Sequence, residues 1–179
     1  MQSRTTRLFA VTLIGTSLVS LAQSQETASE KSPELSVLNR YVGSWEETAT
    51  SKPAVWTPKQ TTMTTTTTRR WILNGQMVEN TGAWLPGNNE LLHLMTYGAE
   101  RKQYVQWYFD KANLAPKAYR GSWNEGTQTF TFTGSLADGI RTKAQQKFVN
   151  KDTFTWTLVA KDREGNVVFD MEGKCVRKK

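Results

Sequence analysis

The sequence predicts an all-β protein, an antiparallel up-and-down barrel of about ten strands with a short helix plugging one end. Apolar and polar residues alternate along most of the chain, as strands with one buried face require. Phe130 and Phe132 alternate with threonines, and Phe154, Trp156 and Leu158 do the same. Turn residues recur at short, regular intervals, and only one early segment has helical spacing. A two-sheet sandwich would show the same alternation and is the alternative.

The helix is expected just before the first strand. Ser32 is a suitable N-cap, and Pro33 suits the first helical position because its missing N–H would be unpaired there. Leu35, Leu38 and Val42 recur at helical spacing and form one apolar stripe. Burying each side chain contributes roughly 1.5–3 kcal/mol, which is enough to hold a short helix that would be marginal alone.

A glycine and a tryptophan mark the passage from this helix to the first strand. Gly43 suits the backbone geometry that ends a helix, and Gly43-Ser44-Trp45 resembles the Gly-x-Trp signature of the calycins, the superfamily of lipocalins and fatty-acid-binding proteins. This resemblance implies that the tryptophan sits at the closed end of the barrel, under a basic side chain from the last strand. Arg177 or Lys174 would supply that cover, so the implied role of the signature is structural.

A nearer resemblance covers the chain from about Leu35 to its C-terminus. The chain is similar to the secreted bacterial family called domain of unknown function fifteen-seventy-nine. The family carries no agreed activity, so the resemblance supports a fold more than a function. Where the family pattern has something like Asp-Pro, this chain has Gly98-Ala99. The matching motifs are Leu35-x-x-Leu38-x-x-Tyr41-Val42-Gly43-x-Trp45, Arg70-x-x-Leu73-x-Gly75, and Tyr97 followed by a charged turn and Tyr104-Val105.

The expected strands are rich in β-branched and aromatic residues and are bounded by turn residues. Asn74-Gly75 is a strong hairpin signal, and Pro86-Gly87 marks another turn. In the last strand, Val167, Phe169 and Met171 are expected to share the inner face. The strand segments are 45–50, 61–73, 76–84, 91–97, 104–109, 117–123, 127–133, 140–149, 153–160 and 167–176.

The first 22 of the 179 residues have the pattern of a signal peptide. Arg4 and Arg7 precede the apolar run Leu8–Leu21, and Ser20-Leu21-Ala22 is a small-x-small cleavage site. A retained membrane anchor is the alternative, but the run is shorter than the roughly 20 residues that a span needs. We therefore expect an exported protein, periplasmic or secreted, with a signal peptide over 1–22, a flexible linker over 23–32 and one barrel domain over 33–179.

Charge and composition argue against several classes of protein. Without Arg4 and Arg7, 21 of the 23 basic residues remain against 16 acidic ones, a net charge of +5. These residues are scattered, whereas a nucleic-acid-binding protein concentrates them in a patch. No nucleic acid partner and no stable membrane anchor after signal cleavage are expected. Cys175 has no second cysteine to pair with and is expected to be an inert thiol.

No catalytic residue, metal site or cofactor is assigned from the sequence. It has one histidine, no paired cysteines and no phosphate-binding glycine loop. His93 shares a strand face with Leu91, Met95 and Tyr97. If that face points inward, His93 could hold haem iron, as a histidine does in nitrobindin-like barrels. The alternative is a hydrogen-bonded or surface histidine.

The remaining candidates are side chains that could meet a ligand inside the barrel. Arg69 and Arg70 are consecutive in a strand, so one of them should face inward, where arginine can pair with a carboxylate. Arg120 is a second cationic candidate; for both, a surface charge is the alternative. The tryptophans could line a pocket or simply form core. The candidate ligand-binding residues are Arg70, Trp84, His93, Tyr97, Trp107, Arg120 and Trp156.

Together these features predict an exported barrel that binds a small hydrophobic or amphipathic ligand. An enzyme that uses polar groups inside the barrel is one alternative, and a non-catalytic envelope interaction module is another. About ten strands enclose more space than the roughly eight of a barrel filled by its own side chains, which favours a ligand cavity.

Overall fold

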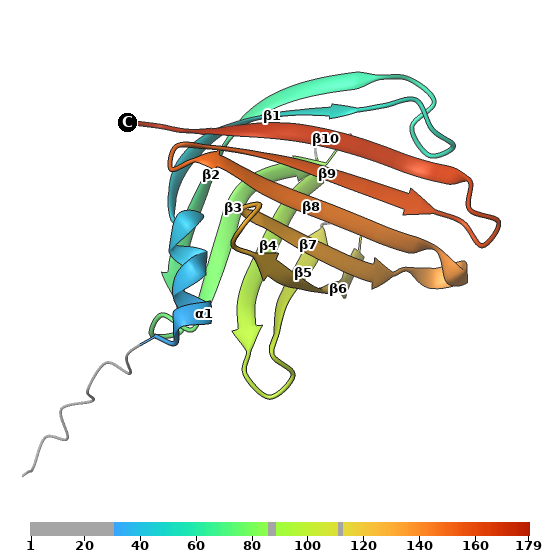
Figure 1. Cartoon of the computed structure of the whole chain (residues 1–179). Helices are drawn as coiled ribbons and strands as arrows, with labels where there is room; N and C mark the ends of the chain where they lie inside the picture. Colours follow the sequence, from blue (N-terminus) through green and yellow to red (C-terminus); the bar gives the residue numbers. More distant parts are fainter. Residues whose placement is uncertain (1–30, 86–88, 111–112) are drawn as a thin grey trace, which may run out of the picture.

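The chain forms a closed barrel of ten antiparallel strands in up-and-down order, with a short helical segment at one end (Figure 1). The computed structural model describes residues 31–85, 89–110 and 113–179, apart from the side chains of 83–85, 89 and 113–117. The segments 1–22 and 23–30 and the Pro86-Gly87 turn therefore lie outside the described residues. The predicted fold class and strand number are both confirmed.

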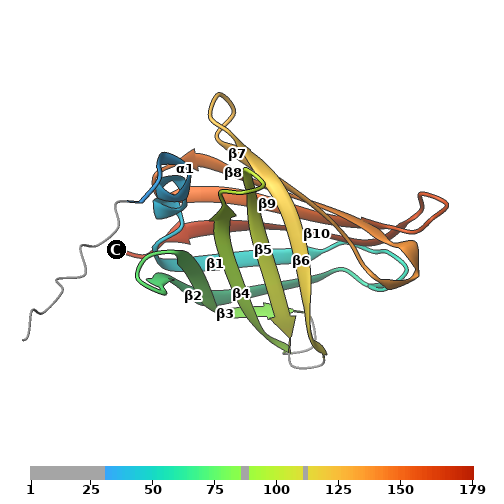
Figure 2. The same cartoon turned by 90° about the horizontal axis from the view of Figure 1, so that it is seen from below.

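Each strand pairs with its neighbours in sequence, and β1 closes the barrel by pairing with β10. The strands are β1 (Gly43–Ser51), β2 (Thr61–Ile72), β3 (Met77–Leu85), β4 (Asn89–Gly98), β5 (Gln103–Asp110), β6 (Asn113–Asn124), β7 (Thr129–Ser135), β8 (Arg141–Asn150), β9 (Thr153–Lys161) and β10 (Val167–Arg177). The helical segments are α1 (Pro33–Ser36), the 3₁₀ turn η1 (Val37–Arg40) and the 3₁₀ turn η2 (Ala137–Gly139). The connections β2–β3 and β8–β9 lie at the end of the barrel that carries α1, and the connections β1–β2, β7–β8 and β9–β10 lie at the other, open end (Figure 2).

The helical segment closes one end of the barrel. The Ser32 hydroxyl caps it by accepting from the Leu35 N–H at 3.1 Å, and the side chains of Leu35 and Leu38 are buried. The segment changes from α-helix to the narrower 3₁₀ helix after Ser36. Tyr104 donates a hydrogen bond to the Glu34 carbonyl at 2.8 Å, which ties the helix to β5.

Beneath the helix lies an aromatic cluster formed by the inward faces of several strands. Trp45, Phe130, Phe132 and Phe154 are 0–2% exposed, and the Trp45 and Phe154 rings meet edge to face with centroids 5.0 Å apart. The Arg177 guanidinium lies 4.1 Å above the Trp45 ring. Gly43 has a φ of 132° and passes so close to Arg177 that a Cβ would clash with its guanidinium.

The last strand departs from the predicted alternation at its first residue. Val167 is 40% exposed and Val168 is 6% exposed, whereas Val167 was expected on the inner face. The pairing of β10 with β9 shifts register between Val167 and Phe169. A bulge of this kind exchanges the inward and outward positions before it and leaves the alternation of the later residues unchanged. Met171 is therefore inward, as expected.

Candidate functional site

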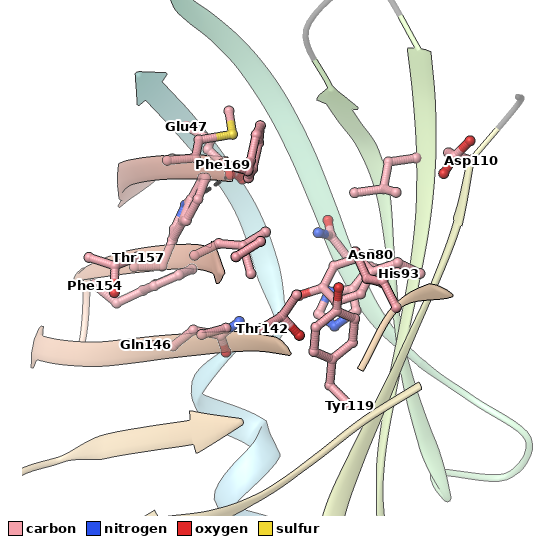
Figure 3. A pocket seen from close by; sticks show the side chains of 18 of the residues that line it. Glu47, Asn80, His93, Asp110, Tyr119, Thr142, Gln146, Phe154, Thr157 and Phe169 are labelled. Carbon is pink, nitrogen blue, oxygen red and sulfur yellow. Dashed lines mark hydrogen bonds between the residues drawn. The ribbon is translucent and has the colours of Figure 1, made fainter. Parts of the chain in front are cut away.

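The interior of the barrel between the aromatic cluster and the open end holds a cavity of about 390 Å³. Strands from both sides of the barrel line it. In Figure 3, Asn80 and His93 lie on the wall that contains β3 and β4, and Gln146 and Phe154 face them from β8 and β9. The volume lies within the range of about 300–1,000 Å³ usual for small-molecule sites.

The charged group deepest in this cavity is an ion pair between β2 and β1. Arg69 Nη2 donates to Glu47 Oε2 at 3.2 Å, and the two side chains are 7% and 12% exposed. Trp156 Nε1 donates to the other carboxylate oxygen of Glu47 at 3.0 Å. Gly173 lies opposite Trp156 on β10, where a Cβ would come within 2.5 Å of the indole. The missing side chain at Gly173 therefore makes room for the tryptophan that holds Glu47.

Four polar side chains lie side by side across adjacent strands, and we call them the polar row: Arg69, Asn80, His93 and Tyr108. Arg69 pairs with Asn80, Asn80 with His93, and His93 with Tyr108 in the strand register. Directly paired residues have Cβ atoms about 4.5–5.5 Å apart, so the row is continuous. All four side chains line the cavity.

His93 is held in place on two sides and is neutral. Its Nε2 lies 3.0 Å from Gln106 Oε1, and its ring stacks on Tyr108 with centroids 4.4 Å apart. Burial, followed by the positive charge of Arg69, lowers the pKa of His93 to about 3. Because the Gln106 oxygen can only accept, the assigned geometry places the imidazole proton on Nε2.

Some polar atoms in this region have no hydrogen-bond partner within the described part of the chain. They are Arg69 Nη1, Asn80 Oδ1, Gln106 Nε2 and Thr67 Oγ1. A buried polar atom without a partner costs about 1–3 kcal/mol. Arg69 and Asn80 both line the cavity, so a polar group there could satisfy atoms that the described protein leaves without a partner.

Burial disfavours the charged form of three tyrosines of the cavity and of a nearby cysteine. Burial raises the pKa of the Tyr41, Tyr108 and Tyr119 hydroxyls. Beside Arg69, burial and the negative charge of Glu47 raise the pKa of the Cys175 thiol to about 12. Asp110 is buried at the open end of β5 and takes part in an interaction of its own.

Among the candidates predicted from sequence, the structure brings His93 and Trp156 together in the cavity. Tyr97 is partly buried and packs on Tyr104 toward the closed end, with ring centroids 5.0 Å apart. The side chain of Trp84 lies outside the described residues.

The other candidates lie away from the cavity. Arg70 points outward and pairs with Glu79 at 2.8 Å, and Arg69 is the inward member of the two. Arg120 is exposed, one residue from the inward Tyr119. Trp107 alternates with the fully buried Gln106 and so faces the outside of the barrel.

Several cavity residues were not among the candidates. Glu47, Asn80, Gln146 and Tyr119 are polar residues on inward faces. Glu47 could have been found from sequence, because it is two residues after Trp45 and must share its face. Among the described residues, no group of three or more His, Cys, Asp or Glu side chains is placed to hold a metal ion. Nor does any helix of this part of the chain have the length and apolarity to cross a membrane.

Comparison with known proteins gives one family match and several distant structural relatives. The family model "Protein of unknown function (DUF1579)" matches residues 30–177. No curated protein matches the chain. Rv2717c from M. tuberculosis has a similar fold, with a TM-score of 0.61 and 8% identity over 84% of this chain and 100% of that one.

A protein of unknown function from the DUF3598 family of Nostoc punctiforme has a TM-score of 0.46 and 11% identity. That match covers 79% of this chain and 48% of the Nostoc chain, so the present chain spans about half of that protein's length.

Proposed function

We propose that the barrel of this chain, which belongs to the DUF1579 family of proteins of unknown function, binds one small amphipathic molecule. The observation that carries the proposal is the cavity of about 390 Å³, with apolar walls and unpartnered polar atoms. Small-molecule sites typically combine mostly apolar walls with a few convergent polar groups.

The two ends of the cavity differ in chemistry, which supports an amphipathic rather than a purely apolar ligand. Arg69, which pairs with Glu47, lies toward the closed end because β2 ends there. The polar row runs from Arg69 across the wall to Tyr108, two residues before the end of β5. Apolar side chains line the part nearer the open end, including those of Leu91, Leu136 and Phe169. Trp56, 47% exposed in the turn between β1 and β2, lies at the entrance with its ring centroid 6.4 Å from that of Phe169.

Binding can be tested with Nile red, a neutral hydrophobic dye whose emission reports a dry environment. We expect saturable binding of one dye per chain, and displacement of the dye by amphipathic competitors. The Ala160→Phe variant fills the cavity from β9 and should lose binding, since Ala160 is 2% exposed and lines the cavity. Lys161→Phe, on the outer face of the same strand, is the matched control and should bind normally. Equal binding by both variants would place the dye elsewhere and contradict the proposal.

We also propose that the barrel is exported. The support is the basic start, apolar run and small-residue cleavage site of residues 1–22. Expression in a bacterial host followed by mass spectrometry of the periplasmic and medium fractions tests this. A mature chain beginning after Ala22 is expected, and an uncut chain in the cytoplasm would contradict the proposal.

A further inference from the structure

We propose that the head group held by the polar row is uncharged and both donates and accepts hydrogen bonds, as a primary amide does, and that it is not a carboxylate. This inference rests on the ligand-binding function proposed above and specifies the chemistry of the ligand. Three features of the cavity carry it: the pair of unpartnered atoms, the charge already present, and the direction of the apolar walls.

The first feature is a donor and an acceptor side by side. Arg69 Nη1 is an unpartnered donor, and Asn80 Oδ1 on the neighbouring strand is an unpartnered acceptor, with the two side chains in direct register. The residues are 6% and 5% exposed. A group whose oxygen accepts from Arg69 while its N–H donates to Asn80 satisfies both atoms together. A carboxylate can satisfy only the arginine, because it has no proton to donate.

The second feature is the balance of charge. Arg69 is the only arginine or lysine among the described residues that line the cavity. Its charge is already balanced by Glu47, 3.2 Å away. His93 supplies no second positive charge, because burial and the charge of Arg69 lower its pKa to about 3. A bound carboxylate would place a second anion on one guanidinium in a site with little water, and burying an uncompensated charge is costly.

A cationic head group is disfavoured by the same arrangement. Arg69 already places one positive charge in the polar row, so a cation bound beside it would be repelled. The neutral head group is therefore the one that leaves the buried ion pair intact and still uses the free donor.

The third feature fixes the direction of the ligand. Arg69 lies near the closed end of β2, whereas Leu158, Ala160, Phe169 and Met171 line the cavity toward the open end. The head group lies deep in the barrel and the apolar tail runs toward the entrance at Trp56. The distance to the open end then limits the length of the tail, and the polar row determines which head groups can bind.

The test compares three competitors with the same apolar chain: decanamide, decanoate and methyl decanoate. Each displaces Nile red from the full-length protein near neutral pH. Decanamide should bind about tenfold more tightly than the ester, which lacks a donor, and more tightly than decanoate. Decanoate binding as tightly as decanamide would overturn the inference while leaving ligand binding intact. Failure of Nile red and of all three competitors would instead overturn the proposed function.

Variants at Asn80 test whether the preference for decanamide depends on this side chain. Asn80→Leu removes the acceptor, and we expect the preference for decanamide over methyl decanoate to fall to about one. Asn80→Ser retains an acceptor oxygen and should recover part of the preference. Thr81→Val, exposed on the outer face of the same strand, is the control and should keep the full preference. Because the readout is a ratio of two affinities within one variant, a general loss of stability does not imitate it. An unchanged ratio in Asn80→Leu overturns the inference.

Discussion

The closed end of the barrel and the cavity next to it follow the same inward alternation of strand residues but fill the interior differently. At the closed end, Trp45, Phe130 and Phe132 are fully buried; Phe130 stacks on Phe132, and Trp45 packs on Phe154. In the cavity, Arg69 and Asn80 are equally inward but keep unpartnered polar atoms. This contrast indicates that the closed end is packed for stability, whereas the cavity is the part where we propose binding. Natural proteins retain unsatisfied polar groups mainly where function requires them.

The largest effect is expected at the closed end. Trp45→Ala should lower the free energy of unfolding by about 3–5 kcal/mol, because it removes a fully buried indole and leaves a void beneath Arg177. Trp56→Ala at the entrance is the matched control and should change stability by no more than about 0.5 kcal/mol. Urea unfolding measures both. Equal losses of unfolding free energy in the two variants would show that the closed end contributes no more to stability than the entrance does.

The second effect concerns the ion pair at the boundary of the two regions. Glu47→Gln should lower the free energy of unfolding by about 3 kcal/mol, because Arg69 would keep a buried charge without its counter-ion. The double variant Glu47→Gln with Arg69→Met removes both charges and should be more stable than Glu47→Gln alone. Thermal unfolding of the two variants checks this, and a double variant less stable than the single would contradict it.

The closed end was more predictable from the sequence than the cavity. The strands and their number followed from alternation and turns, because both are local signals. The inward face of β2 was not assigned, because Thr64–Thr68 contain no alternation of apolar and polar residues. Met63 and Trp71 have the same parity as Arg69 and are the signals that favour it over Arg70 as the inward residue. In β5, aromatic residues occupy both faces, so hydropathy favoured Trp107 over the buried Gln106.

The cavity itself could not be predicted because it depends on contacts between strands distant in sequence. Glu47, Arg69 and Trp156 meet only when β1, β2 and β9 close the barrel. The bulge that turned Val167 outward has the same origin, since it is a property of the pairing of β10 with β9. Local patterns therefore predicted the strands that form the barrel wall. They could not predict the site, because its residues come together only when the barrel closes.

A smaller effect is expected where the wall makes room for the cavity. Gly173→Ala places a Cβ against the Trp156 indole and should push it from its position beside Glu47. We expect a loss of about 1–3 kcal/mol in stability, as for other overpacked sites, together with weaker Nile red binding. Gly165→Ala is a control for altering a glycine away from the wall, because no atom lies within 4 Å of its added Cβ, although its φ of 92° carries some strain. Normal dye binding by Gly173→Ala would show that Trp156 does not shape the cavity.

The last effect is the part of the pH dependence of stability that comes from His93 in the cavity. The folded protein protonates His93 only near a pKa of about 3, whereas the unfolded chain does so near 6.5. Between these values the unfolded state binds more protons, so His93 lowers stability as the pH falls from about 6.5 toward about 3, by at most about 1.4 kcal/mol per pH unit. Urea unfolding at several pH values should therefore give a shallower acid slope for His93→Gln than for the unaltered protein. His93 is the single histidine of the chain, so the difference between the two slopes isolates it from the titrating carboxylates. Identical slopes would mean that His93 is hydrated in the folded barrel. The cavity wall around His93 would then not be dry.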